Sequence, residues 1–92
     1  MSVVEIIQIP VAPEDADELG AVIHDARSGY LAPPRCEQFE VLRADGQIAV
    51  VVRWASARAH DDAADSDASG PFLARVGTLA AGAPSLSVYE PA

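Results

Sequence analysis

Two side chains near the middle of the chain, Trp54 and His60, carry the chemistry that this sequence offers. A tryptophan indole stacks on flat aromatic molecules, and its N–H donates a hydrogen bond to an oxygen on such a ring. Histidine titrates near neutral pH, with an ordinary pKa of about 6.5, so His60 is the best candidate for a group that moves a proton. The two residues predict a site that holds an aromatic ring and exchanges a proton with it.

Both residues also have a purely structural interpretation, and the sequence leaves it open. Trp54 could be a core residue between a sheet and its helices. His60 could be a half-exposed helix residue beside Asp61 and Asp62. The other histidine, His24, lies on the flank of the apolar stripe of a predicted helix and is interpreted as a surface residue.

The remaining titratable residues are interpreted as structural. Arg53 is expected on the face opposite Trp54, paired with Glu37 or Glu40 across strands or across a dimer. Cys36 has no neighbouring motif that would activate its thiol. The acidic residues of segment 61–67 lack the glycine and terminal glutamate of a calcium loop, so no metal site is expected.

Length and charge exclude several classes of function. The chain has 92 residues and a mass of 9.6 kDa, which suffices for a single domain over residues 1–92. Fourteen acidic residues against six basic ones give a formal charge of −8, so neither nucleic acid nor a membrane is an expected partner. No basic leader is present, and no uncharged run approaches the roughly 20 residues of a membrane span. We therefore expect a soluble, cytoplasmic protein.

Hydrophobic periodicity predicts strands and helices in the order β-α-β-β-α-α-β. Asp45-Gly46 is a hairpin turn signal, and Ser56 is a suitable helix N-cap. Gly29 is expected in the left-handed conformation after the first helix, and Leu86 and Val88 are expected to point inward from the last strand. The predicted ranges are 3–11, 13–27, 35–44, 47–56, 57–64, 71–81 and 84–89.

This order is that of the ferredoxin-like split β-α-β fold, an α+β architecture with an antiparallel sheet and helices on one face. Strand 47–56 carries apolar residues on both faces, which indicates a central strand covered on both sides. Helices can cover only one face, so the other face must meet something, and an identical sheet is the simplest candidate. We therefore expect a homodimer that forms through its sheet faces.

Several of these segments resemble the antibiotic biosynthesis monooxygenase superfamily, whose members are small dimeric α+β barrels. The resemblance spans nearly the whole chain. It includes the apolar first strand, the helix from Pro13, the proline-rich connector into RCEQFEVLRA and the strand leading into RWASARAH. Trp54 at the end of that strand, followed by a helix capped by Ser56, is the most recognisable feature.

The chain departs from the family pattern at several positions. Many relatives carry a Glu two residues before the Trp and a His nine residues after it, where this chain has Val52 and Ala63. The haem-degrading branch relies on an Asn, a second Trp and a His that have no counterparts here, so haem degradation is not expected. In the branch similar to quinone-forming monooxygenases of aromatic polyketide pathways, an Asn, a Trp and a Tyr line the pocket. The corresponding positions here are Val50, Trp54 and His60.

The resemblance thus implies a cofactor-independent monooxygenase that acts on a small aromatic or polyketide-type molecule. His60 is the expected catalytic residue; it would ionise a phenol, and the anion would react with oxygen without metal or flavin. The expected substrate-binding residues are Trp54, Val50, Val52 and Phe72. An isomerase or decarboxylase would use the same base without consuming oxygen.

The alternative from a different class is a non-catalytic dimeric domain that binds a small ligand or acts as a scaffold. An enzyme needs a cavity that reaches both Trp54 and His60. A scaffold would instead fill that space with apolar side chains, for which the candidates are Leu19, Ile23, Phe72 and Val76.

Overall fold

Four strands form one antiparallel sheet: β1 (Val3–Pro10), β2 (Cys36–Ala44), β3 (Gln47–Trp54) and β4 (Ser85–Tyr89). Their order in the sheet is β2-β3-β1-β4. The computed structural model describes residues 2–31, 36–64 and 69–92, and it describes side chains outside 27–35 and 63–73. β1 and β3 are the central strands, in agreement with their continuous apolar sequences.

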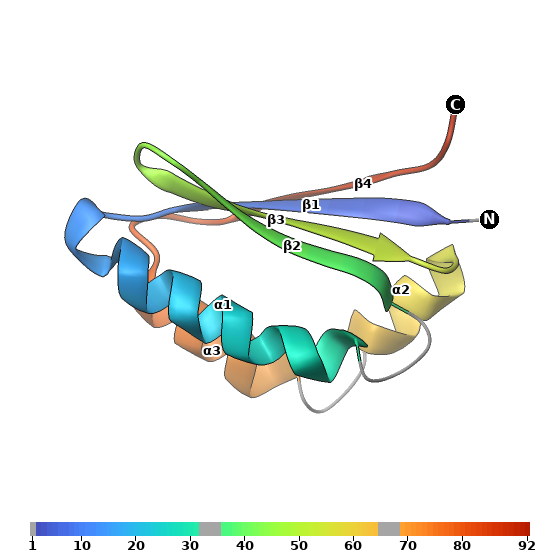
Figure 1. Cartoon of the computed structure of the whole chain (residues 1–92), viewed down its shortest axis with the longest axis horizontal. Helices are drawn as coiled ribbons and strands as arrows, with labels where there is room; N and C mark the ends of the chain where they lie inside the picture. Colours follow the sequence, from blue (N-terminus) through green and yellow to red (C-terminus); the bar gives the residue numbers. More distant parts are fainter. Residues whose placement is uncertain (1, 32–35, 65–68) are drawn as a thin grey trace.

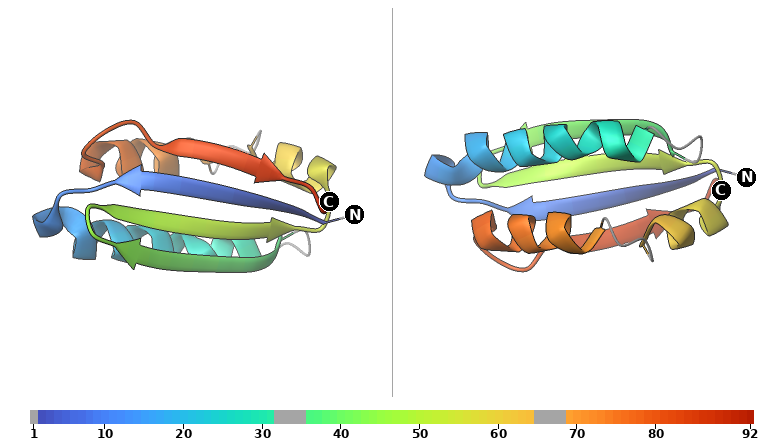
Figure 2. Two further views of the ribbon diagram at one scale, coloured as in Figure 1. Left: turned by 90° about the horizontal axis from the view of Figure 1, so that it is seen from above. Right: turned by 90° about the horizontal axis from the view of Figure 1, so that it is seen from below.

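The helices all lie on one side of this sheet (Figure 1). They are the 3-10 turn η1 (Pro13–Asp15), α1 (Ala16–Leu31), α2 (Ala57–Ala64) and α3 (Ser69–Leu79). α1 lies over β2 and β3, whereas α3 and α2 follow one another along the β4 side (Figure 2). The α+β, ferredoxin-like architecture predicted from the order of the elements is confirmed.

Strand alternation gives the sheet two different faces. The face toward the helices carries the buried residues of β1 and β3, together with the buried side chains of α1 and α3 that pack on them. We call the opposite face the open face. Its central residues, Val4, Ile6, Ala49 and Val51, are only half-buried, and Leu42 and Tyr89 are exposed beside them. The helices thus cover one apolar face and leave the other uncovered within a single chain.

Local signals account for the turns of the chain. Gly46 has a φ of 76°, which the Asp45-Gly46 hairpin between β2 and β3 requires. The carbonyl of Gly46 accepts a hydrogen bond of 3.0 Å from the amide of Val11, so the hairpin also holds the end of β1. Arg43 of β2 pairs with Asp17 of α1 at 2.7 Å.

Several element boundaries differ from the prediction: α1 begins at Ala16 after a 3-10 turn, α3 begins at Ser69, and β1, β2 and β4 differ by one residue at one end. The larger differences have local reasons. α1 continues through Gly29 to Leu31, because a glycine costs a helix only about 1 kcal/mol and does not by itself end it. The predicted connector 32–34 lies outside the described residues. α3 ends at Leu79 rather than at 81, since the amide of Ala81 donates to the carbonyl of Pro10 at 2.8 Å. β3 ends at Trp54, before the capping residue of α2.

The predicted burial of Leu86 and Val88 is wrong. The pairing of Leu86 with Ile7 and of Val88 with Glu5 places both side chains on the helix face, as expected. They are nevertheless 57% and 44% exposed. The reason is that β4 is an edge strand: α1 packs on the other edge of the sheet, and α2 and α3, although they lie on the β4 side, do not pack closely on it in the described part of the chain. No helix within the described parts of the chain is long and apolar enough to span a bilayer.

The core on the helix face predicts a clear contrast between two leucines. Leu19 of α1 is fully buried, whereas Leu42 of β2 is half exposed on the open face. Leu19→Ala should lower the free energy of unfolding by about 2–5 kcal/mol, because it leaves a cavity in the core. Leu42→Ala in the monomeric chain should lower it by less than about 1 kcal/mol. Urea denaturation followed by the fluorescence of Trp54 measures both, and equal losses would contradict this assignment of the core.

Candidate functional site

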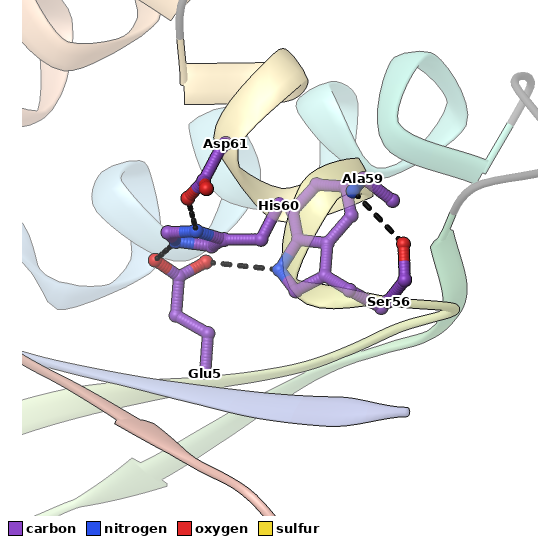
Figure 3. Close-up of polar contacts among 6 residues, drawn as sticks. Glu5, Ser56, Ala59, His60 and Asp61 are labelled. Carbon is purple, nitrogen blue, oxygen red and sulfur yellow. Dashed lines mark hydrogen bonds and ion pairs between the residues drawn. The ribbon is translucent and has the colours of Figure 1, made fainter. Parts of the chain in front are cut away.

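Trp54, the last residue of β3, and His60, in the helix α2 that follows, lie on the same side of the sheet. Ser56 accepts a hydrogen bond of 3.1 Å on its Oγ from the amide of Ala59, which confirms it as the N-cap of α2. The cap fixes the direction in which α2 leaves the sheet and turns His60 back over β1 (Figure 3). The rings of Trp54 and His60 meet edge to face, with centroids 5.9 Å apart and an interplanar angle of 80°.

A carboxylate from the first strand joins these two rings. Oε2 of Glu5 lies 3.0 Å from Nε2 of His60, and Oε1 accepts a hydrogen bond of 3.3 Å from Nε1 of Trp54 (Figure 3). Glu5 is 6% exposed and is the only charged residue that is buried within the described part of the chain. A buried carboxylate is costly unless it is paired, and here two N–H donors supply the pairing.

Glu5 is the site residue that sequence reasoning missed. The sequence does carry a signal for it: Glu5 alternates with Val3, Ile7 and Ile9, so it occupies a helix-face position in a strand that is otherwise apolar there. The family resemblance expects a Glu two residues before the Trp, where this chain has Val52. Glu5 pairs directly with Val52 across β1 and β3. The carboxylate is therefore present at the same level of the sheet, but from the neighbouring strand.

His60 also has a second carboxylate partner. Its Nδ1 lies 3.1 Å from Oδ1 of Asp61, whose side chain is 74% exposed. Ionised carboxylates only accept hydrogen bonds, so the two contacts are satisfied together when both ring nitrogens of His60 carry a proton. Partial burial of the ring acts to lower the pKa of His60, but the hydrogen bonds and charges of Asp61 and Glu5 outweigh it and raise this pKa above its ordinary value. The arrangement therefore favours an imidazolium.

The other predicted site residues lie elsewhere. Val50 and Val52 are 2% and 1% exposed and belong to the packed core. The side chain of Phe72 lies outside the described residues. Val50 and Val52 belong to one buried apolar cluster with side chains of the helices, among them Leu19, Ile23 and Val76. The structure thus brings Trp54 and His60 together with Glu5 at the α2 end of the sheet. Val52 lies beside Glu5 as its cross-strand partner, but its side chain, like that of Val50, is enclosed in the core.

Arg53, His24 and Cys36, interpreted as structural from the sequence, lie away from the cluster of Glu5, Trp54 and His60 or in the core. Arg53 is exposed on the open face, opposite to Trp54 as predicted, while Glu37 accepts a hydrogen bond from Ser2 and Glu40 one from Gln38. His24 is exposed on α1, and Cys36 is buried, with its thiol donating to the carbonyl of Gln38 at 3.4 Å. Among the residues with described positions, no group of three His, Cys, Asp or Glu side chains is arranged to hold a metal ion.

The contact between Glu5 and His60 can be tested by titration. Glu5→Gln removes one of the two negative charges beside His60, so the pKa of His60 should fall. An NMR titration of the two histidine rings measures it, with Glu18→Gln in α1 as the matched control, since Glu18 pairs with exposed Arg75 and not with His60. An unchanged titration of His60 in Glu5→Gln would contradict the geometry.

The same shift has a consequence for stability. Because the pKa of His60 is raised in the folded state, its stabilising contribution is complete below the unfolded pKa of about 6.5 and is lost as the pH rises through the folded pKa. In the natural chain, the free energy of unfolding should therefore fall as the pH rises from about 6.5 through the folded pKa of His60. In Glu5→Gln the fall should be smaller, as measured by urea denaturation across this pH range.

Comparison with known proteins finds a matching family and similar folds. The family model of antibiotic biosynthesis monooxygenases matches residues 2–75. Rv0793 from Mycobacterium tuberculosis has a similar structure, with a TM-score of 0.88 and 22% identity over 100% of this chain and 96% of that one. A Caulobacter crescentus CB15 protein that carries the family's name has a TM-score of 0.90 and 23% identity, over 99% and 90% of the two chains.

A third similar structure is that of SnoaB, a cofactor-independent oxygenase from Streptomyces nogalater. Its TM-score is 0.86 and its identity 15%, over 99% of this chain and 93% of that one. No curated protein sequence matches the chain. The structural likenesses show a shared fold, and the family model covers most of the sequence. The chain therefore belongs to the antibiotic biosynthesis monooxygenase family.

Proposed function

We propose that this protein is a cofactor-independent monooxygenase that acts on a small phenolic substrate of the aromatic polyketide type. The observation that carries the proposal is the pairing of His60 with Glu5 at 3.0 Å, beside the indole of Trp54. The imidazole of His60 can exchange a proton near neutral pH, and the neighbouring carboxylate of Glu5 favours its charged form. The family, and the cofactor-independent oxygenase of the same fold, support this class of reaction.

The proposed reaction balances with molecular oxygen as the only co-reactant. The Glu5–His60 pair takes the proton of the phenol hydroxyl, and the phenolate gives one electron to oxygen. The resulting radical combines with superoxide to form a carbon–oxygen bond, and the peroxide regains a proton from the pair. Loss of water then leaves a quinone. For 1-naphthol, one molecule of oxygen yields one 1,4-naphthoquinone and one water, with four electrons passing from substrate to oxygen.

Each residue has a separate part in this scheme. Trp54 is itself only 3% exposed, so its indole would position the aromatic ring by edge or face contact only where the ligand enters the layer that covers it. His60 accepts the proton in its neutral form, so turnover should rise with pH through its raised pKa. Glu5 holds the imidazole in place. Val50 and Val52 contribute only if the helix layer over them moves, because both are buried.

Oxygen uptake tests the proposal. With a panel of polycyclic phenols that includes 1-naphthol, the natural chain should consume oxygen and release the quinone. His60→Gln should lower kcat by about 100-fold or more, because proton transfer to a positioned base commonly contributes that much. His24→Gln is the matched control and should leave kcat unchanged. Full turnover in His60→Gln would show that another group moves the proton.

A second candidate is a non-catalytic domain that binds a small ligand or acts as a scaffold. Leu19, Ile23 and Val76 are buried in one apolar cluster with Val50 and Val52, which is the packing that this alternative requires. The two candidates differ in one result. A binding domain would respond to a phenol in the NMR spectrum of Trp54 while consuming no oxygen.

We also propose that the protein acts as a homodimer joined through the open face. This face carries half-buried Val4, Ile6 and Val51 on its central strands, and burying such apolar area stabilises a chain that is small for its surface. Exposed Leu42 and Tyr89 extend the apolar area toward both edges.

Sedimentation equilibrium tests the dimer. The natural chain should sediment at twice its mass of 9.6 kDa. Val51→Glu should dissociate it, since it places a charge at the centre of the open face. Thr78→Glu, on the exposed surface of α3, is a control of similar size change and should remain dimeric. A monomeric natural chain would overturn the proposal.

A further inference from the structure

The geometry points to Glu5 as the residue that determines which ligand the site accepts: its carboxylate receives a ligand hydroxyl and rejects a ligand carbonyl. This inference rests on the proposed function for the class of ligand, a small aromatic molecule. It adds a specificity that the family assignment does not contain, namely a preference for the phenol over the quinone.

The preference follows from a count of donors and acceptors. The indole of Trp54 has one N–H, and it points at Oε1 of Glu5. The two ring nitrogens of His60 face Oε2 of Glu5 and Oδ1 of Asp61. The nitrogen donors of both rings are therefore engaged by carboxylates of the chain itself. None is left over for an incoming oxygen that can only accept a hydrogen bond.

Acceptor capacity, in contrast, remains on Glu5. A carboxylate offers about four lone-pair sites, and the residues that the structure describes use one on each oxygen. A ligand O–H can add to these without breaking an existing contact. A quinone oxygen would instead face the carboxylate oxygens, and among the side chains described around Glu5 it would have to displace Trp54 or His60 to find a donor. That exchange leaves Glu5 short of a partner in a buried position, which is unfavourable.

The neighbouring strand supplies a place for the ring of such a ligand. Val88 pairs with Glu5, and Leu86 pairs with Ile7, so all four side chains lie on the helix face. Val88 and Leu86 are 44% and 57% exposed, while the side chain of Glu5 is 8% exposed. An aromatic ring that lies on this apolar strip of β4 would bury it and bring its hydroxyl toward Glu5. The occupant that fits is a flat aromatic molecule with a hydroxyl at its edge.

For the proposed reaction, this preference favours turnover. The substrate carries the hydroxyl that Glu5 accepts, and the reaction removes its proton and leaves a carbonyl at that position. The product therefore loses the hydrogen bond that held the substrate, and its release is favoured. Glu5 thus distinguishes the substrate from the product by whether the ligand can donate a hydrogen bond to it.

Three ligands of nearly equal size test the inference in the absence of oxygen. They are 1-naphthol, 1-methoxynaphthalene, which lacks the donor, and 1,4-naphthoquinone, which has only acceptors. The NMR resonance of the indole N–H reports binding, because Trp54 is the single tryptophan of the chain. We expect 1-naphthol to bind at least about tenfold more tightly than either of the others, as a hydrogen bond to a buried charged acceptor provides.

Glu5→Gln should reduce this preference to less than about threefold, since an amide offers a donor as well as an acceptor. Glu18→Gln should keep it. Equal affinity for 1-naphthol and 1,4-naphthoquinone in the natural chain would overturn the inference, and so would an unchanged preference in Glu5→Gln. The comparison of 1-naphthol with 1,4-naphthoquinone uses the natural chain alone, so it does not depend on the folding of a variant. Binding is measured without oxygen, so the two proposals can fail separately. Tighter binding of 1-naphthol without oxygen consumption would contradict only the proposed monooxygenase. Oxygen consumption without tighter binding of 1-naphthol would contradict only the proposed role of Glu5.

Discussion

A single buried carboxylate organises the candidate site. Glu5 sits on the helix face of a central strand, where every neighbour along that face is apolar, and it would be strongly destabilising without partners. Trp54 and His60 provide these partners from the end of β3 and from α2. Glu5 therefore holds both the indole and the imidazole in place, and Asp61 and Glu5 together raise the pKa of His60.

The site and the core occupy different parts of the same face. Toward α1 and α3, apolar side chains form one buried cluster with Val50 and Val52. At the α2 end, polar groups meet, and the adjoining residues of β4 are exposed. This division allows one small domain to combine a closed apolar core with a polar candidate site at the α2 end of the sheet. It also locates the proposed ligand toward β4 and not over the centre of the sheet.

Much of the architecture was predictable because it depends on local signals and on periodicity. The hairpin followed from Asp45-Gly46, the cap of α2 from Ser56, and the two central strands from their apolar runs. The end of α1 and the exposure of β4 were not predictable in this way. Gly29 permits a helix to continue or to stop, and the burial of an edge strand depends on where a distant helix packs.

The sequence by itself determined that the chain forms an α+β domain with a Trp and a His at one end of a strand, because alternation and capping are properties of neighbouring residues. Only the tertiary structure decided that Glu5, 49 positions before Trp54 and 55 before His60, completes the site. Pairing of β1 with β3 sets that contact, and no local pattern encodes which strands pair or in which register. Because Glu5 and Val52 are direct partners on neighbouring strands, β1 supplies the carboxylate that β3 lacks at Val52.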